Sequence, residues 1–388
     1  MSARPRNAKG QRAGRKRRPL AAWLAAIVLG LAAAAALAGA YLLTPKRGRG
    51  AAVRVTIPAG ASAAQVTTLL WRAGVIERPW AFRPLLVLSG AYGRVRPGMV
   101  PLRDDLAPRA VLRALARGGG LVRVTIPEGF TRFEIARRLD AMGVCDDAAF
   151  LAATEAPDAV RAAGATAGDG VAPTLEGYLF PDTYDLPLGG PCEAVVERMT
   201  GVFQRRMEAL RGRHPEGFAR AAALAGDDGD PVRLLVTLAS LVEAETGHPD
   251  DRPHVAGVFW NRLTRPDFRP RLLQSDPAVT YGCLAGPRAG APVACAPADG
   301  GAAPITATML DDPRNPWNTY RHEGLPPTPV CNPGGAALEA ALAPLASDDL
   351  YFVARGDGRS AFAATLDAHR RNVRELLRPR PRPPGGAP

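Results

Sequence analysis

Two carboxylates, Glu243 and Glu245, follow an apolar stretch and are the side chains in this sequence best suited to chemistry. Residues 230–247 are expected to form one helix, which Asp230 caps and Gly247 closes in the left-handed conformation. Both acids fall in its last turn. An apolar surround and the negative end of the helix dipole each raise a carboxyl pKa. A general acid working near neutral pH needs such a rise.

Helix geometry keeps these two acids apart. Residues two positions apart point about 200° away from each other on a helix, so Glu243 and Glu245 cannot act side by side on one atom. Each acid lies on a helix face whose preceding residues are mostly apolar. Periodicity therefore does not decide which of the two is the catalytic acid. The alternative is that one is solvated while the other binds neighbouring loops. The sequence has no His-Glu-x-x-His, Walker loop or Gly-x-Ser-x-Gly motif. Acid–base chemistry is therefore favoured, and no metal or cofactor is predicted.

The N-terminal region predicts a membrane anchor. Of the net charge of +12, residues 1–18 hold eight basic residues and no acid, which leaves +4 for the other 370 residues. Nucleic-acid binding is therefore not expected. Residues 19–43 carry no charge and are long enough to span a bilayer. We favour an uncleaved anchor over a signal peptide or a buried helix. The preceding basic excess predicts a cytoplasmic N-terminus, with the rest of the chain outside the cytoplasm.

An internal repeat organises the next part of the chain. The eight residues 53–60 return at 122–129 with one mismatch. Each copy reads as a short strand and a Pro-x-Gly turn, followed by an amphipathic helix at 63–72 or 132–142. The sequence therefore predicts a duplicated strand–turn–helix unit in small α/β modules, with a boundary near the glycine run that ends at residue 120.

Five cysteines suit an oxidising compartment. Cys283 could pair with Cys295 and Cys145 with Cys192, leaving Cys331 unpaired; small buried thiols are the alternative. The aromatic segment 175–184 could shape a cleft or be a tight turn with packed aromatic rings. A strand is expected at 350–354, and the Pro/Arg-rich end is expected to be disordered.

Several of these motifs occur together, in order, over about residues 50–375. As a set they resemble the endolytic murein transglycosylases, the MltG or YceG-like family. The matching segments are Leu238 to Thr246, Val255 to Leu263, Leu273 to Gly282, Leu175 to Tyr184, Asn318 to Tyr320, Gly324 to Pro327 and Leu350 to Val353.

This resemblance implies an α+β inner-membrane protein with a periplasmic catalytic domain that binds peptidoglycan glycan strands, and wall-synthesis proteins as further partners. The implied domains are a basic cytoplasmic tail at 1–18, a transmembrane helix at 19–43, a LysM-like module at 51–120, a mostly helical catalytic domain at 121–375 that includes the second repeat at 122–144, and a disordered tail at 376–388.

The resemblance also implies a reaction. One Glu protonates the oxygen between N-acetylmuramic acid and N-acetylglucosamine. It then takes a proton from the muramic 6-hydroxyl, and a 1,6-anhydro ring closes. Glu245-Thr246 looks like the Glu-Ser pair of other lytic transglycosylases, so Glu245 is the implied acid and Glu243 the reserve. The implied substrate-binding residues, each of which could instead fix a loop, are Gln274, Asp276, Asn318, Tyr320 and Tyr178.

Three segments depart from the family pattern. The segment about 283–303 is an insertion, 266–272 lacks the expected turn motif, and 98–100 differs from the module's usual Gly-x-Tyr. These differences bear on the cleft rim and on glycan contacts of the small module. A hydrolytic muramidase and a non-catalytic, membrane-anchored wall-binding scaffold are the alternative functions.

Overall fold

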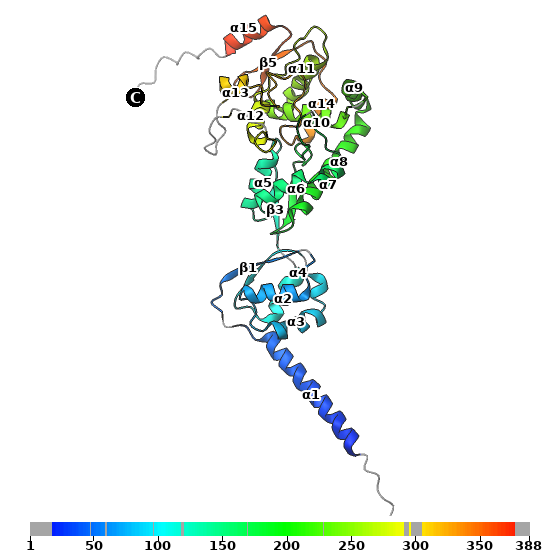
Figure 1. Cartoon of the computed structure of the whole chain (residues 1–388), viewed down its shortest axis with the longest axis vertical. Helices are drawn as coiled ribbons and strands as arrows, with labels where there is room; N and C mark the ends of the chain where they lie inside the picture. Colours follow the sequence, from blue (N-terminus) through cyan, green and yellow to red (C-terminus); the bar gives the residue numbers. More distant parts are fainter. Residues whose placement is uncertain are drawn as a thin grey trace, which may run out of the picture. The chain divides into compact units, whose positions relative to one another are not determined.

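The structure is a computed structural model that describes residues 18–376 except 47, 59, 96, 118–119, 169, 228, 291–294 and 296–304. The described residues form many helices and a few short strands, which agrees with the predicted α+β class (Figure 1). The chain divides into two compact units, 1–119 and 120–388. The predicted tails lie outside the described residues, apart from Arg18 and Leu376.

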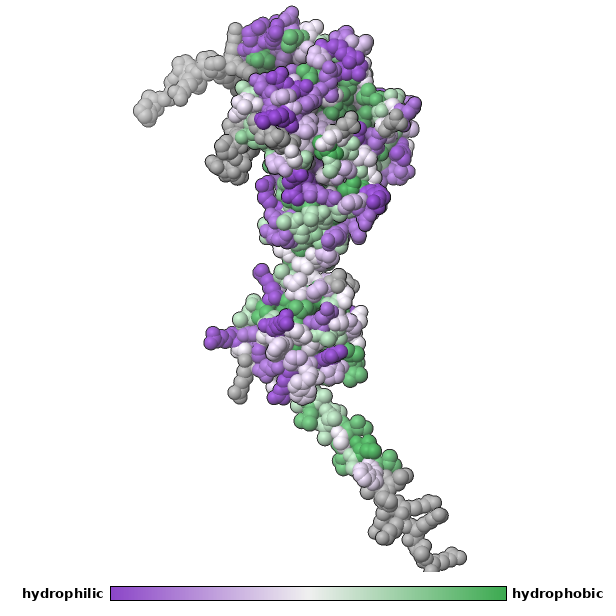
Figure 2. All heavy atoms as spheres, in the orientation of Figure 1, coloured by the Kyte–Doolittle hydropathy of each residue, from purple (hydrophilic) through white to green (hydrophobic). Residues whose placement is uncertain are grey.

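The first helix, α1 (Arg18–Leu43), is apolar over its length. Its window Ala26–Leu43 has a mean hydropathy of 2.2, and none of this window is buried within the protein. Figure 2 shows a hydrophobic surface along this helix. By length and composition, α1 is able to cross a membrane.

The rest of the first unit is built on one antiparallel strand pair. Strands β1 and β2 pair from Ala52↔Arg103 to Ile57↔Gly98, and two helices lie between them in sequence. Phe82, Leu70 and Val111 are among the fully buried residues of its own apolar core. The elements are β1 (Ala52–Ile57), α2 (Ala63–Arg72), α3 (Pro79–Leu88), η1 (Tyr92–Arg94), β2 (Gly98–Arg103) and α4 (Pro108–Arg117).

Both copies of the repeated sequence fold as strand, turn and helix. The helices α2 and α5 (Arg132–Ala141) each begin with a capping box, formed by Ser62 with Gln65 and by Thr131 with Glu134. The strand β3 (Leu121–Thr125) pairs antiparallel with β4 (Thr183–Pro187). Glycines take positive φ at matching turns and helix ends: Gly60 and Gly74 in the first copy, and Gly129 and Gly143 in the second.

The second unit surrounds α10 (Pro231–Glu245), whose residues 234–242 are all buried. This helix packs against α9, α11, α12 and α14. The unit's other helices are α6 (Asp147–Glu155), α7 (Pro157–Ala163), α8 (Cys192–Arg213), α9 (Pro215–Ala225), η2 (Pro249–Asp251), α11 (Arg252–Thr264), α12 (Asp276–Ala285), α13 (Ala307–Asp311), α14 (Gly335–Leu342) and α15 (Leu366–Leu376).

A small hairpin and two disulfides complete this unit. Strands β5 (Tyr351–Ala354) and β6 (Ser360–Ala363) pair antiparallel, and α15 packs against both. Cys145 is bonded to Cys192 and Cys283 to Cys295, while Cys331 is free and buried. Of the two alternatives that the sequence left open, the structure has the paired cysteines rather than free buried thiols at these four positions.

Candidate active site

The helix α10 carries the candidate acids at its C-terminal end. Asp230 caps it by accepting a 2.8 Å hydrogen bond from the Val232 N–H, as predicted. The predicted closure by Gly247 is wrong. The helix ends at Glu245 and Thr246 is already extended, so Gly247 does not adopt a positive φ. Glu245 is therefore the last residue of the helix.

Glu243 is held by a buried ion pair. Its carboxyl accepts hydrogen bonds from Arg252 at 2.9 Å and from the Gly334 N–H at 2.9 Å. Arg252 also approaches Glu128, in the turn of the second repeat, at 3.6 Å. Burial raises the pKa of Glu243, and the Gly334 N–H and Arg252 oppose that rise. This arrangement ties α10 to α11 and to the start of α14.

Glu245 lines a pocket of about 380 Å³. Among the described residues, no ion pair reaches its carboxyl. Burial raises the pKa of Glu245 to about 7. The Ser275 side chain favours the ionised form, nearby Asp276 opposes it, and Arg262 favours it again. Near neutral pH this carboxyl can therefore exist either as a proton donor or as a proton acceptor, as an acid–base catalyst requires.

The loop before α12 brings two further predicted residues to this pocket, Gln274 and Asp276. Thr319 fixes this loop: its carbonyl accepts from the Gln274 N–H at 3.1 Å, and its hydroxyl accepts from the Ser275 N–H at 2.8 Å. Among the described non-glycine residues, Gln274 alone has a positive φ, of 54°. Such a backbone conformation is uncommon and is often associated with functional sites.

Tyr320 is the fourth predicted residue in the pocket. Its hydroxyl donates a 2.7 Å hydrogen bond to Asp276, which fixes the direction of both side chains. The motif Asn-Thr-Tyr thus supplies a loop anchor in Thr319 and a pocket wall in Tyr320. The structure therefore groups Glu245, Gln274, Asp276 and Tyr320 around one cavity.

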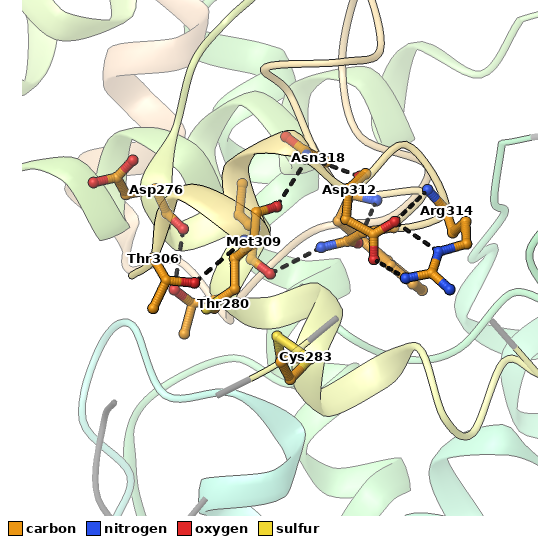
Figure 3. The surroundings of a disulfide bond; sticks show 12 residues. Asp276, Thr280, Cys283, Thr306, Met309, Asp312, Arg314 and Asn318 are labelled. Atoms are coloured by element: carbon orange, nitrogen blue, oxygen red, sulfur yellow. Dashed lines mark hydrogen bonds and ion pairs between the residues drawn. A yellow bond between two sulfur atoms is a disulfide. The ribbon is translucent and has the colours of Figure 1, made fainter. Parts of the chain in front are cut away.

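Asn318 has a different place. It is fully buried, and its amide nitrogen lies 2.9–3.2 Å from the carbonyl oxygens of Met309, Leu310 and Asp312. Its side-chain oxygen accepts from the Tyr320 N–H at 3.0 Å. Figure 3 shows Asn318 between the segments of Met309 and Asp312. Asn318 fixes the loop that carries Tyr320 and does not line the pocket.

Tyr178 also lies away from the pocket. Its ring is fully buried and packs against Phe203 with a centroid distance of 5.0 Å. Neighbouring Glu176 is buried too, and it accepts hydrogen bonds from the Arg132 N–H and from Asn332. The segment 175–184 therefore contributes to the core of the unit, and its aromatic residues serve packing.

Arg262 is a pocket residue that motif reasoning missed as a site residue. It is buried, and it donates to the Leu350 carbonyl at 2.7 Å and to the Leu273 carbonyl at 2.6 Å. These bonds join α11 to the start of the hairpin and to the loop before Gln274. The sequence signal for this residue was an arginine among apolar helix positions. Such an arginine is expected to be buried, and a buried guanidinium needs fixed hydrogen-bond partners.

The hairpin and α15 provide the remaining walls, which include Tyr351, Ser360 and His369. The His369 ring stacks on Tyr351 at 5.4 Å between centroids. Burial lowers the pKa of His369, and Arg262 lowers it further, so the imidazole is neutral at neutral pH. Within the described ranges, no group of three or more His, Cys, Asp or Glu side chains could hold a metal ion.

Comparison with known proteins identifies the family of this chain. The chain belongs to the YceG-like family, whose profile matches residues 55–375. It is 28% identical over 351 residues to a protein of Bacillus subtilis (strain 168) named endolytic murein transglycosylase, covering 86% of this chain and 87% of that protein.

Two further relatives extend the comparison. A protein of the same name from Streptococcus pneumoniae serotype 2 (strain D39 / NCTC 7466) is 29% identical over 346 residues, covering 83% of this chain and 58% of that protein. A crystal structure of a yceG-like protein from Listeria monocytogenes superimposes with a TM-score of 0.52 at 25% identity, covering 83% of this chain and 99% of that one.

Proposed function

We propose that this protein is an endolytic murein transglycosylase, a lyase that cuts peptidoglycan glycan strands internally. Family membership and the names of the similar proteins support the reaction class. The environment of the Glu245 carboxyl supports the assignment of the catalytic acid to this residue. This carboxyl lines the pocket, no ion pair of the described residues holds it, and its pKa is raised to about 7.

Glu245 would perform both proton transfers. As an acid it gives its proton to the glycosidic oxygen, and the bond from the muramic C1 to that oxygen breaks. The resulting carboxylate then takes the proton of the muramic 6-hydroxyl while O6 bonds to C1, which closes the 1,6-anhydro ring. The carboxyl ends the cycle protonated, as it began, and no water is consumed. One carboxyl with a pKa near neutrality suffices for this sequence.

Gln274, Asp276 and Tyr320 are the proposed substrate-binding residues. They present an amide, a carboxylate and a phenol to the pocket, and these groups suit sugar hydroxyls and N-acetyl groups. Asn318 and Tyr178 are left out of the proposed binding set because both are fully buried.

A hydrolytic muramidase is the second candidate. Asp276 lines the same pocket as Glu245, and paired carboxylates are the usual equipment for glycoside hydrolysis. The two reactions leave different products, because the anhydro end is lighter than the hydrolysed end by one water, about 18 Da.

Mass spectrometry of purified glycan strands digested by wild type, Glu245→Gln and Glu243→Gln tests these assignments. We expect anhydro-muramic ends from wild type and from Glu243→Gln. Glu245→Gln should lose roughly 10²- to 10⁴-fold in rate, the usual contribution of general acid–base catalysis. Products with only reducing ends would favour the muramidase. An active Glu245→Gln beside an inactive Glu243→Gln would move the acid to Glu243, and glycan cleavage by neither wild type nor variant would favour the wall-binding scaffold.

We also propose that α1 anchors the chain in the inner membrane, with the N-terminus in the cytoplasm and the part of the chain that follows α1 outside. The apolar window of α1 supports the anchor, and the two disulfides suit an oxidising compartment. The first unit, with two helices between paired strands, would serve as a LysM-like glycan-binding module. Wall-synthesis proteins are the proposed neighbours of the anchored enzyme.

A further inference from the structure

The helix α3 exposes an apolar face. Trp80 is 76% exposed and Leu88 83% exposed, and Val87 is also exposed. With Arg83 and Pro84 they follow the spacing of one helical face, opposite the fully buried Phe82 and Leu86. A surface helix normally presents polar residues on its outer side. Large apolar residues gathered on such a face mark an interaction surface.

The C-terminal end of α1 packs against α4, and two observations place α3 near it within the first unit. Leu42 packs on the apolar core of that unit, and it lines a groove together with Ser89, just after α3. At the other end of α3, Arg78 interacts electrostatically with the Tyr41 phenol. Figure 1 shows α3 on the side of the unit where α1 joins it. The residues that flank α3 therefore lie near the residues at which the apolar window of α1 ends.

Basic side chains accompany this apolar face. Arg83 belongs to the face, Arg78 precedes it, and Arg94 and Arg109 line the same groove as Leu42. Guanidinium groups attract the phosphates of a membrane surface, and long basic side chains place their charge among headgroups while their stems cover apolar groups. Tryptophan is enriched at the same depth of a bilayer. Apolar and basic groups are thus mixed as a lipid interface requires.

We infer that the outer face of α3 lies in the phospholipid headgroup layer of the bilayer that α1 spans. This inference rests on the proposed membrane anchor. Trp80, Val87 and Leu88 enter the interface, while Arg78 and Arg83 meet lipid phosphates. The first unit is then held against the membrane by a second contact, and it cannot swing freely about the end of α1.

Tryptophan quenching in the full-length protein tests this contact. The protein is reconstituted into phosphatidylethanolamine/phosphatidylglycerol vesicles with or without spin-labelled headgroups, and aqueous iodide is the opposing quencher. Subtracting the emission of Trp80→Phe from that of wild type isolates Trp80, and Trp23→Phe isolates a residue of α1. We expect the lipid label to remove most of the emission of both tryptophans, and iodide to leave Trp80 largely unquenched.

Two exposed leucines provide matched variants. Leu88→Glu places a charge on the α3 face, and we expect iodide to quench Trp80 in this variant. Leu121→Glu, at another exposed leucine in the second unit, should change nothing. Trp23 quenched by lipid while Trp80 is quenched only by iodide would overturn the inference and keep the anchor. Trp23 unquenched by lipid would overturn both. Protection of Trp80 from both quenchers would indicate a protein partner and also overturn the inference.

Discussion

At the scale of single residues, the two glutamates of α10 differ in what compensates their charge. Glu243 has a guanidinium and a backbone N–H within hydrogen-bonding distance, and its side chain is 6% exposed. Glu245 has a cavity on one side and a pKa raised by burial. The carboxyl of Glu243 is thus tied to its neighbours by hydrogen bonds, whereas the carboxyl of Glu245 faces a cavity where a sugar could exchange a proton with it.

The raised pKa of Glu245 predicts a pH-dependent stability difference between wild type and Glu245→Gln. Between pH 4.5 and about 7 the unfolded state loses this proton while the folded state keeps it, so wild-type stability falls as pH rises. Glutamine has no such titration. A rise from 4.5 to about 7 corresponds to at most roughly 3 kcal/mol. Glu245→Gln should therefore gain stability relative to wild type at pH 8 but not at pH 4.

Urea unfolding of both proteins at the two pH values measures this difference. Glu208→Gln, at an exposed carboxyl on α8, is the control and should track wild type throughout. An unchanged gap between wild type and Glu245→Gln from pH 4 to pH 8 would show that Glu245 titrates normally. The same proton should also set the alkaline limit of kcat/KM, because the free enzyme must begin protonated.

The motifs predicted several residues that line the pocket beside Glu245, but they did not predict which side chains point into the core instead. Gln274, Asp276 and Tyr320 line the pocket, yet Asn318, two residues before Tyr320, points into the protein and binds carbonyl groups. A loop without regular periodicity carries no signal for side-chain direction. Arg262 and His369 reach the pocket through long-range packing that a local pattern does not encode.

At the scale of elements, strong local signals were reliable. The Asp-Pro start predicted α10, and the cap and turn residues predicted both copies of the repeat. Gly247 shows the limit of such signals, because Thr246 leaves the helix first in an extended conformation. The strand partners β2 and β4 were not predicted, because sheet pairing joins segments that lie far apart in sequence.

The two disulfides should differ in their contribution to stability. Cys145–Cys192 closes a loop with a sequence separation of 47, and Cys283–Cys295 one of 12. Loop-closure entropy predicts losses of about 4 and about 3 kcal/mol when the respective pairs are replaced by serine. Chemical unfolding of the two double variants measures this. A single cysteine variant leaves an unpaired thiol and is therefore an unsuitable control. Wild type that has been reduced, with its thiols then blocked, serves as the control without either disulfide. A larger loss for Cys283–Cys295 would contradict the loop-length argument.

At the scale of the whole molecule, the chain has two compact units with separate apolar cores. Separate cores predict separate unfolding transitions. Leu70→Ala in the first core and Leu235→Ala in the second should each cost about 2–5 kcal/mol, because both side chains are almost fully buried. Each variant serves as the control for the other.

Calorimetry of the full-length protein in detergent checks this prediction. Leu70→Ala should lower one transition and Leu235→Ala the other. A single transition that both variants lower equally would mean that the two cores unfold cooperatively. Glycan cleavage by Leu70→Ala at a temperature below its transition should stay close to the wild-type value, because the proposed active site lies in the second unit.

The positive φ of Gln274 has a consequence for how this chain can vary. Glycine would adopt that backbone conformation with less strain, by about 1–2 kcal/mol. A sequence shaped by stability alone would therefore be expected to carry glycine at position 274. Keeping a long amide there, on the wall of the pocket, exchanges robustness for a side chain that the fold itself does not require. The proposed role of Gln274 in glycan binding thus implies that selection for activity and selection for stability act in opposite directions at position 274.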